Sequence, residues 1–265
     1  MNANNHNMLT TKGLTIKFGG LLAVDQVDID VKHRSVMGLI GPNGSGKTTI
    51  FNMISGLYIP TSGDIQFNGE SLIGKQAYEI ARKGVARTFQ ASRLCLDLSV
   101  LDNVFIGMHS RQKQGLFSAV FNRQLVAEEI SRGREKAFFL LNSFNPSLVK
   151  RAGEPAGKLA QIDRRRVEIC RAMAMDPRLL LLDEPSAGMT PEEIEELMLD
   201  IRKVQQASSD ITIIIVEHVM SVIRSITEHV VVLNFGRKIA EGSFHEVSNN
   251  QEVLEAYLGK RGGAQ

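Results

Sequence analysis

A glycine-rich segment in the first fifth of the chain has residue types and spacing suited to binding phosphate. The sequence GPNGSGKTT follows the apolar run VMGLI and precedes IFNMISGL, which is the pattern of a phosphate-binding loop between a strand and a helix. Its glycines let backbone N–H groups converge on one ligand, Lys47 adds a positive charge, and Thr48 offers a hydroxyl to Mg²⁺. An ordinary glycine-rich turn would need neither Lys47 nor Thr48. The candidate nucleotide-binding residues of this loop are Gly41, Asn43, Gly44, Ser45, Gly46, Lys47, Thr48 and Thr49.

Two adjacent carboxylates, Asp183 and Glu184, follow a run of four leucines. A buried strand that ends there would bring both residues to one edge of a sheet, with their side chains pointing in different directions. We expect Asp183 to hold Mg²⁺ and Glu184 to act as the general base that polarises water for attack on a terminal phosphate. The alternative is a solvated acidic turn, and the phosphate-binding loop earlier in the chain argues against it.

Three single residues are candidates for the same site. His218 follows the apolar run ITIIIV and would emerge at a strand end, where it could bond the terminal phosphate. Gln90 closes the strand-like run VARTFQ and could reach the metal or the attacking water. Phe18 stands beside two glycines and could stack on a nucleobase. Each also has an ordinary explanation, respectively a structural histidine, a surface glutamine and a core aromatic.

These residues need a sheet whose buried strands end at a common edge. Apolar runs predict buried, parallel strands at residues 36–40, 179–182, 211–216 and 230–233, and alternating patterns predict half-buried strands at 14–18 and 27–31. A helix is predicted from Pro191, because acidic residues come first and basic residues late. Residues from about 100 to 159 show mostly helical patterns, including the run QLVAEEISRGREKAFFLLNSF.

We therefore predict an α/β fold. It comprises a P-loop NTPase core with a mainly parallel sheet flanked by helices, a small antiparallel β layer and an inserted helical subdomain. One domain is expected over residues 8–259, with the helical subdomain at about 91–165. Residues 1–7 and 260–265 are expected to be flexible.

Composition narrows the functional class. The 265 residues are 43% hydrophobic and 23% charged, with a formal net charge of +2, so no basic surface for nucleic acid is indicated. Cys95 and Cys170 form no paired motif, and the N-terminal residues lack the order of a secretion signal. The longest apolar runs fall far short of the roughly 20 residues that cross a bilayer. We expect a protein of the reducing cytoplasm that reaches a membrane only through a partner.

The phosphate-binding loop, Gln90, the triplet Asp183-Glu184-Pro185 and His218 resemble, in order and rough spacing, the motifs of the ATP-binding cassette (ABC) ATPases. The resemblance covers nearly the whole chain. It implies ATP and Mg²⁺ as ligands, Phe18 as the adenine-stacking aromatic, Gln90 as the residue that senses the membrane subunit, Glu184 as the catalytic base and His218 as the switch histidine. The loop Ser186–Met189 would contact a second cassette.

Within that family the chain is similar to the ATPases of branched-chain amino-acid importers. The shared segments are FGGLLAV, GVARTFQ, GLFSAVF, DEPSAGM and EVLEAYLG. The resemblance implies a peripheral subunit on the cytoplasmic face of the inner (plasma) membrane, bound to transmembrane permease subunits and served indirectly by a periplasmic or extracellular solute-binding protein. The solute would be a branched-chain amino acid or a related small molecule. We expect Arg93, Leu94 and Leu96, after Gln90, to contact the permease.

One segment departs from the family pattern. A Leu-Ser-Gly-Gly-Gln-like signature is expected before the register set by Arg166, Val167 and Arg171, and the residues there are Leu159, Ala160, Gln161, Ile162 and Asp163. The serine hydroxyl is absent, Ile162 would obstruct backbone approach, and Asp163 would repel phosphate while also capping the following helix. Because the family pairs each signature with the partner's ATP, this degenerate signature predicts a heterodimer with a different cassette chain.

Two other functions fit the same motifs. A regulatory cassette that binds ATP with little turnover would share the altered signature, but Glu184 and His218 argue for hydrolysis. A soluble ABC ATPase of DNA repair or chromosome maintenance would share the motifs as well. Such proteins are usually interrupted by long coiled coil, and the stretch between Gln90 and Leu159 is too short and lacks sustained heptads.

Overall fold

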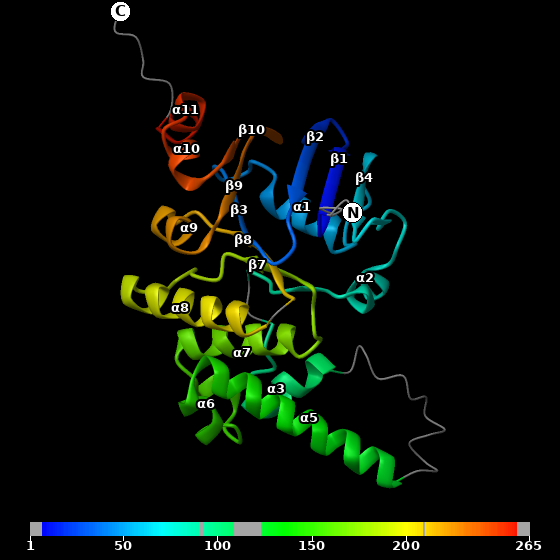
Figure 1. Ribbon diagram of the computed structural model, residues 1–265, viewed down its shortest axis with the longest axis vertical. Helices are drawn as coiled ribbons and strands as arrows, with labels where there is room; N and C mark the ends of the chain where they lie inside the picture. The colour runs from blue at the N-terminus through cyan, green and yellow to red at the C-terminus, as the bar shows by residue number, and fades with distance from the viewer. Residues whose placement is uncertain (1–6, 91–92, 109–122, 209, 259–265) are drawn as a thin grey trace, which may run out of the picture. The chain divides into compact units, whose positions relative to one another are not determined.

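The computed structural model describes residues 7–90, 93–108, 123–208 and 210–258 (Figure 1). They fall into two compact units, the first built from the chain up to Val85, residues 178–184 and the chain after residue 208, and the second from residues 86–177 and 185–208. The strands are β1 Leu9–Phe18, β2 Leu21–Val31, β3 Val36–Ile40, β4 Ser62–Phe67, β5 Glu70–Ser71, β6 Val85–Arg87, β7 Leu179–Asp183, β8 Thr212–Val216, β9 His229–Asn234 and β10 Arg237–Gly242. The helices are α1 Lys47–Ile54, α2 Ala77–Lys83, α3 Val100–Ile106, α5 Arg123–Phe144, α6 Pro146–Lys150, the 3-10 helix η2 Ala156–Lys158, α7 Gln161–Met173, α8 Pro191–Ala207, α9 Met220–Ile226, α10 Phe244–Ser248 and α11 Gln251–Leu258.

Two sheets form the first unit. An antiparallel sheet has the strand order β2-β1-β4-β5, and a larger sheet has the order β10-β9-β3-β8-β7-β6. Only Val85 of β6 belongs to this unit. Strands β9, β3, β8 and β7 run parallel, and every residue of β3, β7 and β8 is buried. Continuous apolar strands of this kind are typical of parallel sheets covered on both faces.

Helix α1 connects the two sheets through a common hydrophobic core. Its residues Ile50, Phe51, Met53 and Ile54 belong to one cluster with apolar side chains from β1, β2 and β4 and from β3, β7, β8 and β9. Because α1 directly follows the loop after β3, this packing fixes the direction in which the loop leaves the sheet.

The second unit is helical in its described part. Helix α7 contacts α3, α5 and α8 in the unit's interior (Figure 1). Arg166 lies buried between α7 and α8, where it donates to Asp163 at 3.0 Å, Asp200 at 2.6 Å and Glu196 at 2.6 Å. Burial alone would lower the pKa of Arg166, but these three hydrogen bonds raise it. Replacing Arg166 would remove the cation that the buried carboxylates of Asp163 and Asp200 share, at a cost of about 3–5 kcal/mol.

The structure confirms the predicted fold class and adds strands that the sequence patterns did not reveal. The predicted strands at 14–18 and 27–31 are the ends of the longer strands β1 and β2, and the short polar strands β4, β5 and β10 were not predicted. The run VARTFQ is a strand only as far as Arg87. The helix predicted from Pro191 is α8, and Thr190 caps it by accepting from the Glu193 N–H.

Some predictions lie outside the described residues. They are the segment GLFSAVF at 115–121 and the flexibility of residues 1–6 and 260–265. The division into one cassette domain with an insert at about 91–165 stays a prediction. Among the described helices, none combines the length and the apolar character needed to cross a membrane.

Candidate active site

Apart from Phe18, the candidate residues of the first unit gather where three neighbouring strands end. Strand β8 lies between β3 and β7, and the register sets Val216 beside both Leu39 and Asp183. Because all three strands are parallel, their carboxyl ends share one edge of the sheet. The glycine loop follows β3, Asp183 ends β7 with Glu184 next to it, and the pair Glu217-His218 follows β8.

The glycine loop has a backbone that side chains would not permit at two positions. Gly41 has φ +149°, and a Cβ there would lie 2.1 Å from the Leu233 carbonyl oxygen. Gly46 has φ +104°, and a Cβ there would lie 2.9 Å from the Ala23 oxygen. The Gly236 N–H also donates to the Ser45 carbonyl at 3.1 Å. The loop is therefore held closely against both sheets.

Lys47 lies buried inside this loop. Its Nζ donates to the carbonyl oxygens of Gly41 at 2.7 Å and Pro42 at 2.9 Å. Burial lowers the pKa of Lys47, and the negative charges of Glu184 and Asp183 act in the opposite direction. A cation that has lost water and is held by neutral carbonyls is poised to exchange them for an anionic oxygen.

The Ser45 hydroxyl tests whether the loop suits phosphate. Its Oγ is buried and finds no hydrogen-bond partner among the described residues. A buried hydroxyl without a partner costs free energy, and a phosphate oxygen in the loop would provide one. Asn43 and Thr48 are exposed, and Thr49 is half-buried, next to the same loop. The residues present therefore fit the predicted nucleotide phosphates.

The carboxylates of Asp183 and Glu184 occupy different environments. Asp183 is buried at the end of β7, whereas Glu184 is partly exposed. Glu184 has φ +45°, a left-handed conformation that costs a residue other than glycine roughly 1–3 kcal/mol, and its N–H donates to the Val216 carbonyl at 2.9 Å. Backbone strain of this kind is concentrated at functional sites. The oxygen ligands of Asp183 and Thr48 are of the type that Mg²⁺ prefers.

His218 stands at the same edge with an exposed ring, so it is not a core histidine. The preceding residue, Glu217, is fully buried and was not predicted to take part. Its carboxylate accepts from the His218 N–H at 3.2 Å and lies 4.0 Å from the ring nitrogen Nδ1. A buried acid at the end of an apolar strand was the signal in the sequence that could have identified it.

Phe18 ends β1 with 43% of its surface exposed, so it is not a core aromatic either. Its ring meets the Tyr58 ring edge to face, with centroids 5.3 Å apart and an interplanar angle of 72°. Tyr58 follows α1 and is itself exposed. Its contact with Phe18 joins residues 40 positions apart in the sequence, which no local pattern indicates.

Tyr257, on the C-terminal helix α11, also reaches the phosphate-binding loop. Its hydroxyl is buried, and burial raises the pKa of Tyr257 to about 12, while the nearby backbone of Gly41 acts in the opposite direction. The C-terminal helix thus brings a tyrosine near the backbone of Gly41, although its hydroxyl forms no hydrogen bond among the described residues.

Gln90 and the segment Leu159–Asp163 belong to the second unit. Gln90 is exposed and follows β6 at a bend. Ala160 is the N-cap of α7 and has no side-chain oxygen, so the prediction that Asp163 caps this helix is wrong. Asp163 instead pairs with Arg166 at 3.0 Å and Arg151 at 3.6 Å, which compensates its charge.

Two more expectations for the second unit need correction. The Ile162 side chain is buried inside this unit, so it offers no exposed obstruction at the start of α7. Leu94, predicted to contact the permease, is only 8% exposed and belongs to the core.

Gln161 is exposed, and its Nε2 donates to the Ala187 carbonyl at 2.8 Å, in the loop that follows Glu184-Pro185.

Comparison with known proteins identifies the family of this chain. The profile of the ABC transporter family matches residues 24–187, and that of the branched-chain amino acid ATP-binding cassette transporters matches residues 237–262. The chain is 39% identical over 253 residues to the high-affinity branched-chain amino acid transport ATP-binding protein BraF of Pseudomonas aeruginosa, covering 96% of this chain and 98% of BraF. It is 38% identical over 256 residues to the corresponding protein LivG of Escherichia coli, with coverage of 96% and 98%.

A solved structure shares the architecture. The ADP conformation of MJ1267, an ATP-binding cassette of an ABC transporter, matches with a TM-score of 0.83 and 30% identity, covering 96% of this chain and all of that one. The chain therefore belongs to the ABC transporter ATPases, in the group of branched-chain amino-acid transport ATP-binding proteins.

Proposed function

We propose that this chain is the peripheral ATPase subunit of an importer for branched-chain amino acids or a related small solute, on the cytoplasmic face of the plasma membrane. The observation that carries the ATPase chemistry is the common edge of β3, β8 and β7, where the phosphate-binding loop, Glu217-His218 and Asp183-Glu184 meet. The solute class rests on the similarity to BraF and LivG and on the family match at residues 237–262. A solute-binding protein would take part indirectly, through the permease.

Each candidate side chain of the first unit then has a defined role in binding or hydrolysing ATP. Backbone N–H groups of the loop and Lys47 bind the phosphates of ATP, and the exposed face of Phe18 stacks on the adenine. Thr48 and Asp183 would hold Mg²⁺, and the bound ion would neutralise part of the phosphate charge. The family resemblance alone adds Gln90 of the second unit as a ligand. Glu184 accepts the proton of the attacking water.

His218 completes the site. Its exposed ring can donate a hydrogen bond to the terminal phosphate, while the buried Glu217 holds the backbone N–H of the same residue. Glu184 keeps a left-handed backbone directly after Asp183, and it is partly exposed where Asp183 is buried. We assign the partly exposed carboxylate to the attacking water and the buried one to the cation.

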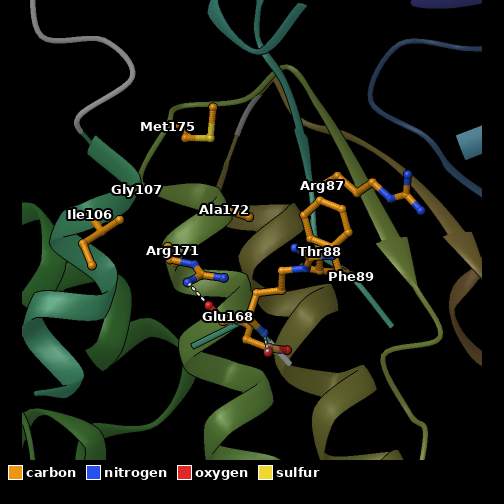
Figure 2. Close-up of a pocket in the computed structure, with 10 residues that line it drawn as sticks. Arg87, Thr88, Phe89, Ile106, Gly107, Glu168, Arg171, Ala172 and Met175 are labelled. Atoms are coloured by element: carbon orange, nitrogen blue, oxygen red, sulfur yellow. Dashed lines mark hydrogen bonds between the residues drawn. The ribbon is translucent and has the colours of Figure 1, made fainter. Parts of the chain in front are cut away.

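The second unit offers a surface for the permease. A pocket of about 240 Å³ opens there, lined by Arg87, Thr88, Phe89, Arg93, Ile106, Gly107, Glu168, Arg171, Ala172 and Met175 (Figure 2). Ile106 of this lining is exposed, and in the same unit Leu96 is 47% exposed and Leu98 is exposed as well. Exposed apolar side chains in a unit with a cationic pocket suit a protein segment with apolar and acidic residues. We call the pocket and these exposed residues the dock.

A heterodimer remains our proposal for the altered signature. Ala160 cannot form the serine hydrogen bond to a phosphate, which is worth roughly 1.5–3 kcal/mol, or about ten- to a hundredfold in affinity. Repulsion by Asp163 no longer supports the idea, because Arg166 and Arg151 compensate that charge. Since a signature serves the ATP of the opposite chain, this chain's Glu184 would work best against a partner with an intact signature.

Variants of the phosphate-binding loop and of the catalytic base should affect different steps, ATP binding and ATP hydrolysis respectively. Lys47→Ala should weaken ATP binding about ten- to a hundredfold, because it removes a charged donor to phosphate. Glu184→Gln should keep ATP bound and slow hydrolysis by roughly 10²- to 10⁴-fold. Equilibrium binding of a fluorescent ATP analogue and single-turnover hydrolysis measure both, with the exposed Lys12→Ala as the control. Native hydrolysis by the Glu184→Gln variant would remove this residue as the base.

The dock is tested by variants that separate surface from core. Arg93→Glu and Leu96→Ser should each reduce ATP-driven leucine uptake at least tenfold in vesicles that contain the native permease, with ATP binding kept. Leu94→Ser should instead lower the thermal unfolding temperature, because it places a hydroxyl in the core. Full uptake by both surface variants, or loss of ATP binding, would show that these residues are no dock.

The heterodimer is tested in the complex purified with its native partner. Glu184→Gln in this chain should abolish most turnover, whereas changing the matching glutamate of the partner should have a smaller effect. Equal losses from the two variants, or brisk hydrolysis by this chain as a homodimer, would contradict unequal sites.

A further inference from the structure

Three side chains of α7 hold the chain on both sides of Gln90. Arg165 Nη1 donates to the Phe89 carbonyl at 3.2 Å, just before Gln90. Glu168 Oε1 accepts from the Arg93 N–H at 3.1 Å, and Arg171 Nη1 donates to the Arg93 carbonyl at 2.6 Å. Residues three apart lie on neighbouring turns of one helix face, so α7 presents these groups as one row.

Glu168 is the central member of this row. It is 4% exposed, and its second oxygen accepts from Arg165 at 2.7 Å, whose own exposure is 7%. One carboxylate therefore both neutralises a buried guanidinium and bonds the backbone of Arg93. An ion pair this well buried is held in a single geometry, because breaking it leaves a charge without compensation.

The same helix begins at the altered signature. Ala160 is its N-cap, and Gln161 in its first turn reaches the Ala187 carbonyl. Helix α7 has 13 residues without a break, and its backbone hydrogen bonds link its first turn to the turns that carry Arg165, Glu168 and Arg171. A displacement of Phe89 and Arg93 would therefore reach the start of the helix.

Two members of the row, Glu168 and Arg171, line the pocket of the dock. Figure 2 shows Glu168 and Arg171 from α7 and Phe89 from the segment after β6 around one pocket. The guanidinium groups of Arg93 and Arg87 lie over the Phe89 ring, at 4.7 and 5.1 Å from its centroid. A permease segment that filled this pocket would touch Glu168 and also Arg93, whose N–H is bonded to Glu168.

We propose that Glu168 is a positioning residue that links occupation of the dock to the signature segment at the start of α7. The inference rests on the proposed dock, and it assigns to one buried carboxylate the transmission between the residues flanking Gln90 and Leu159–Asp163. Filling the pocket shifts Phe89 and Arg93, the bonds to Glu168 and Arg165 carry the shift to α7, and the first turn of the helix responds.

Hydrogen–deuterium exchange in the cassette with and without its native permease tests this link. In the native protein, permease binding should change the exchange of the Phe89 and Arg93 amides and of Leu159–Asp163. In the double variant Arg165→Met/Glu168→Leu, the first response should stay and the second should fall to less than half. The bond from Arg171 to the Arg93 carbonyl remains in this variant and accounts for the residual response. The apolar pair fills the space of the ion pair, and such replacements are usually tolerated by the fold.

Two further variants test whether the response depends on the charge of Glu168 itself. Glu168→Gln keeps an oxygen for the Arg93 N–H but loses the charge, so it should give an intermediate response. Glu196→Gln changes a carboxylate that bonds Arg166 instead of the row, and it should respond like the native protein. An equal response of Leu159–Asp163 in the native protein and the double variant would overturn the role of Glu168 and leave the dock standing. No change at Phe89 and Arg93 on permease binding would remove the dock and this inference with it.

Discussion

The parallel register of β3, β8 and β7 is the constraint on which the first unit depends. With Leu39, Val216 and Asp183 side by side, a residue that follows any of these strands must emerge at the same edge. For this reason the negative charges of Asp183 and Glu184 raise the pKa of Lys47 against the effect of burial, although more than 130 residues separate them from Lys47 in the sequence. The short apolar strands therefore bring together site residues that lie far apart in the sequence, which no local motif could do alone.

Backbone strain and the burial of polar groups at this edge both indicate a site prepared for an anion. Glu184 keeps an unfavourable backbone angle, Lys47 is stripped of water, and the Ser45 hydroxyl is buried without a partner among the described residues. Each costs stability in the protein alone, and each is relieved or used when an anion enters the loop. A fold that binds and releases ATP in every cycle needs this kind of pre-organisation, since the cost is met before the ligand arrives.

Local chemistry decided which parts could be predicted. The loop residues were predictable because glycines, Lys47 and Thr48 at fixed spacing have few other uses, and the buried strands because their apolar runs are uninterrupted. Long-range pairing was not. The sequence suggests that Asp163 caps a helix, but Arg166 and Arg151 compete for its carboxylate. The polar strands β4 and β10, and the bond between Glu168 and a residue 75 positions earlier, carry no periodic signal.

The central claim is that ATP takes the place of neutral carbonyls around Lys47, and the pKa of this lysine tests it most directly. In the free protein, burial should hold the pKa of Lys47 below that of an ordinary lysine. Bound phosphate should raise this pKa, because a nearby negative charge favours the protonated amine. NMR titration of ¹⁵N-labelled lysine, assigned with Lys47→Arg, should show the rise on adding ATP to the Glu184→Gln protein. An unchanged pKa at saturating ATP would contradict the account.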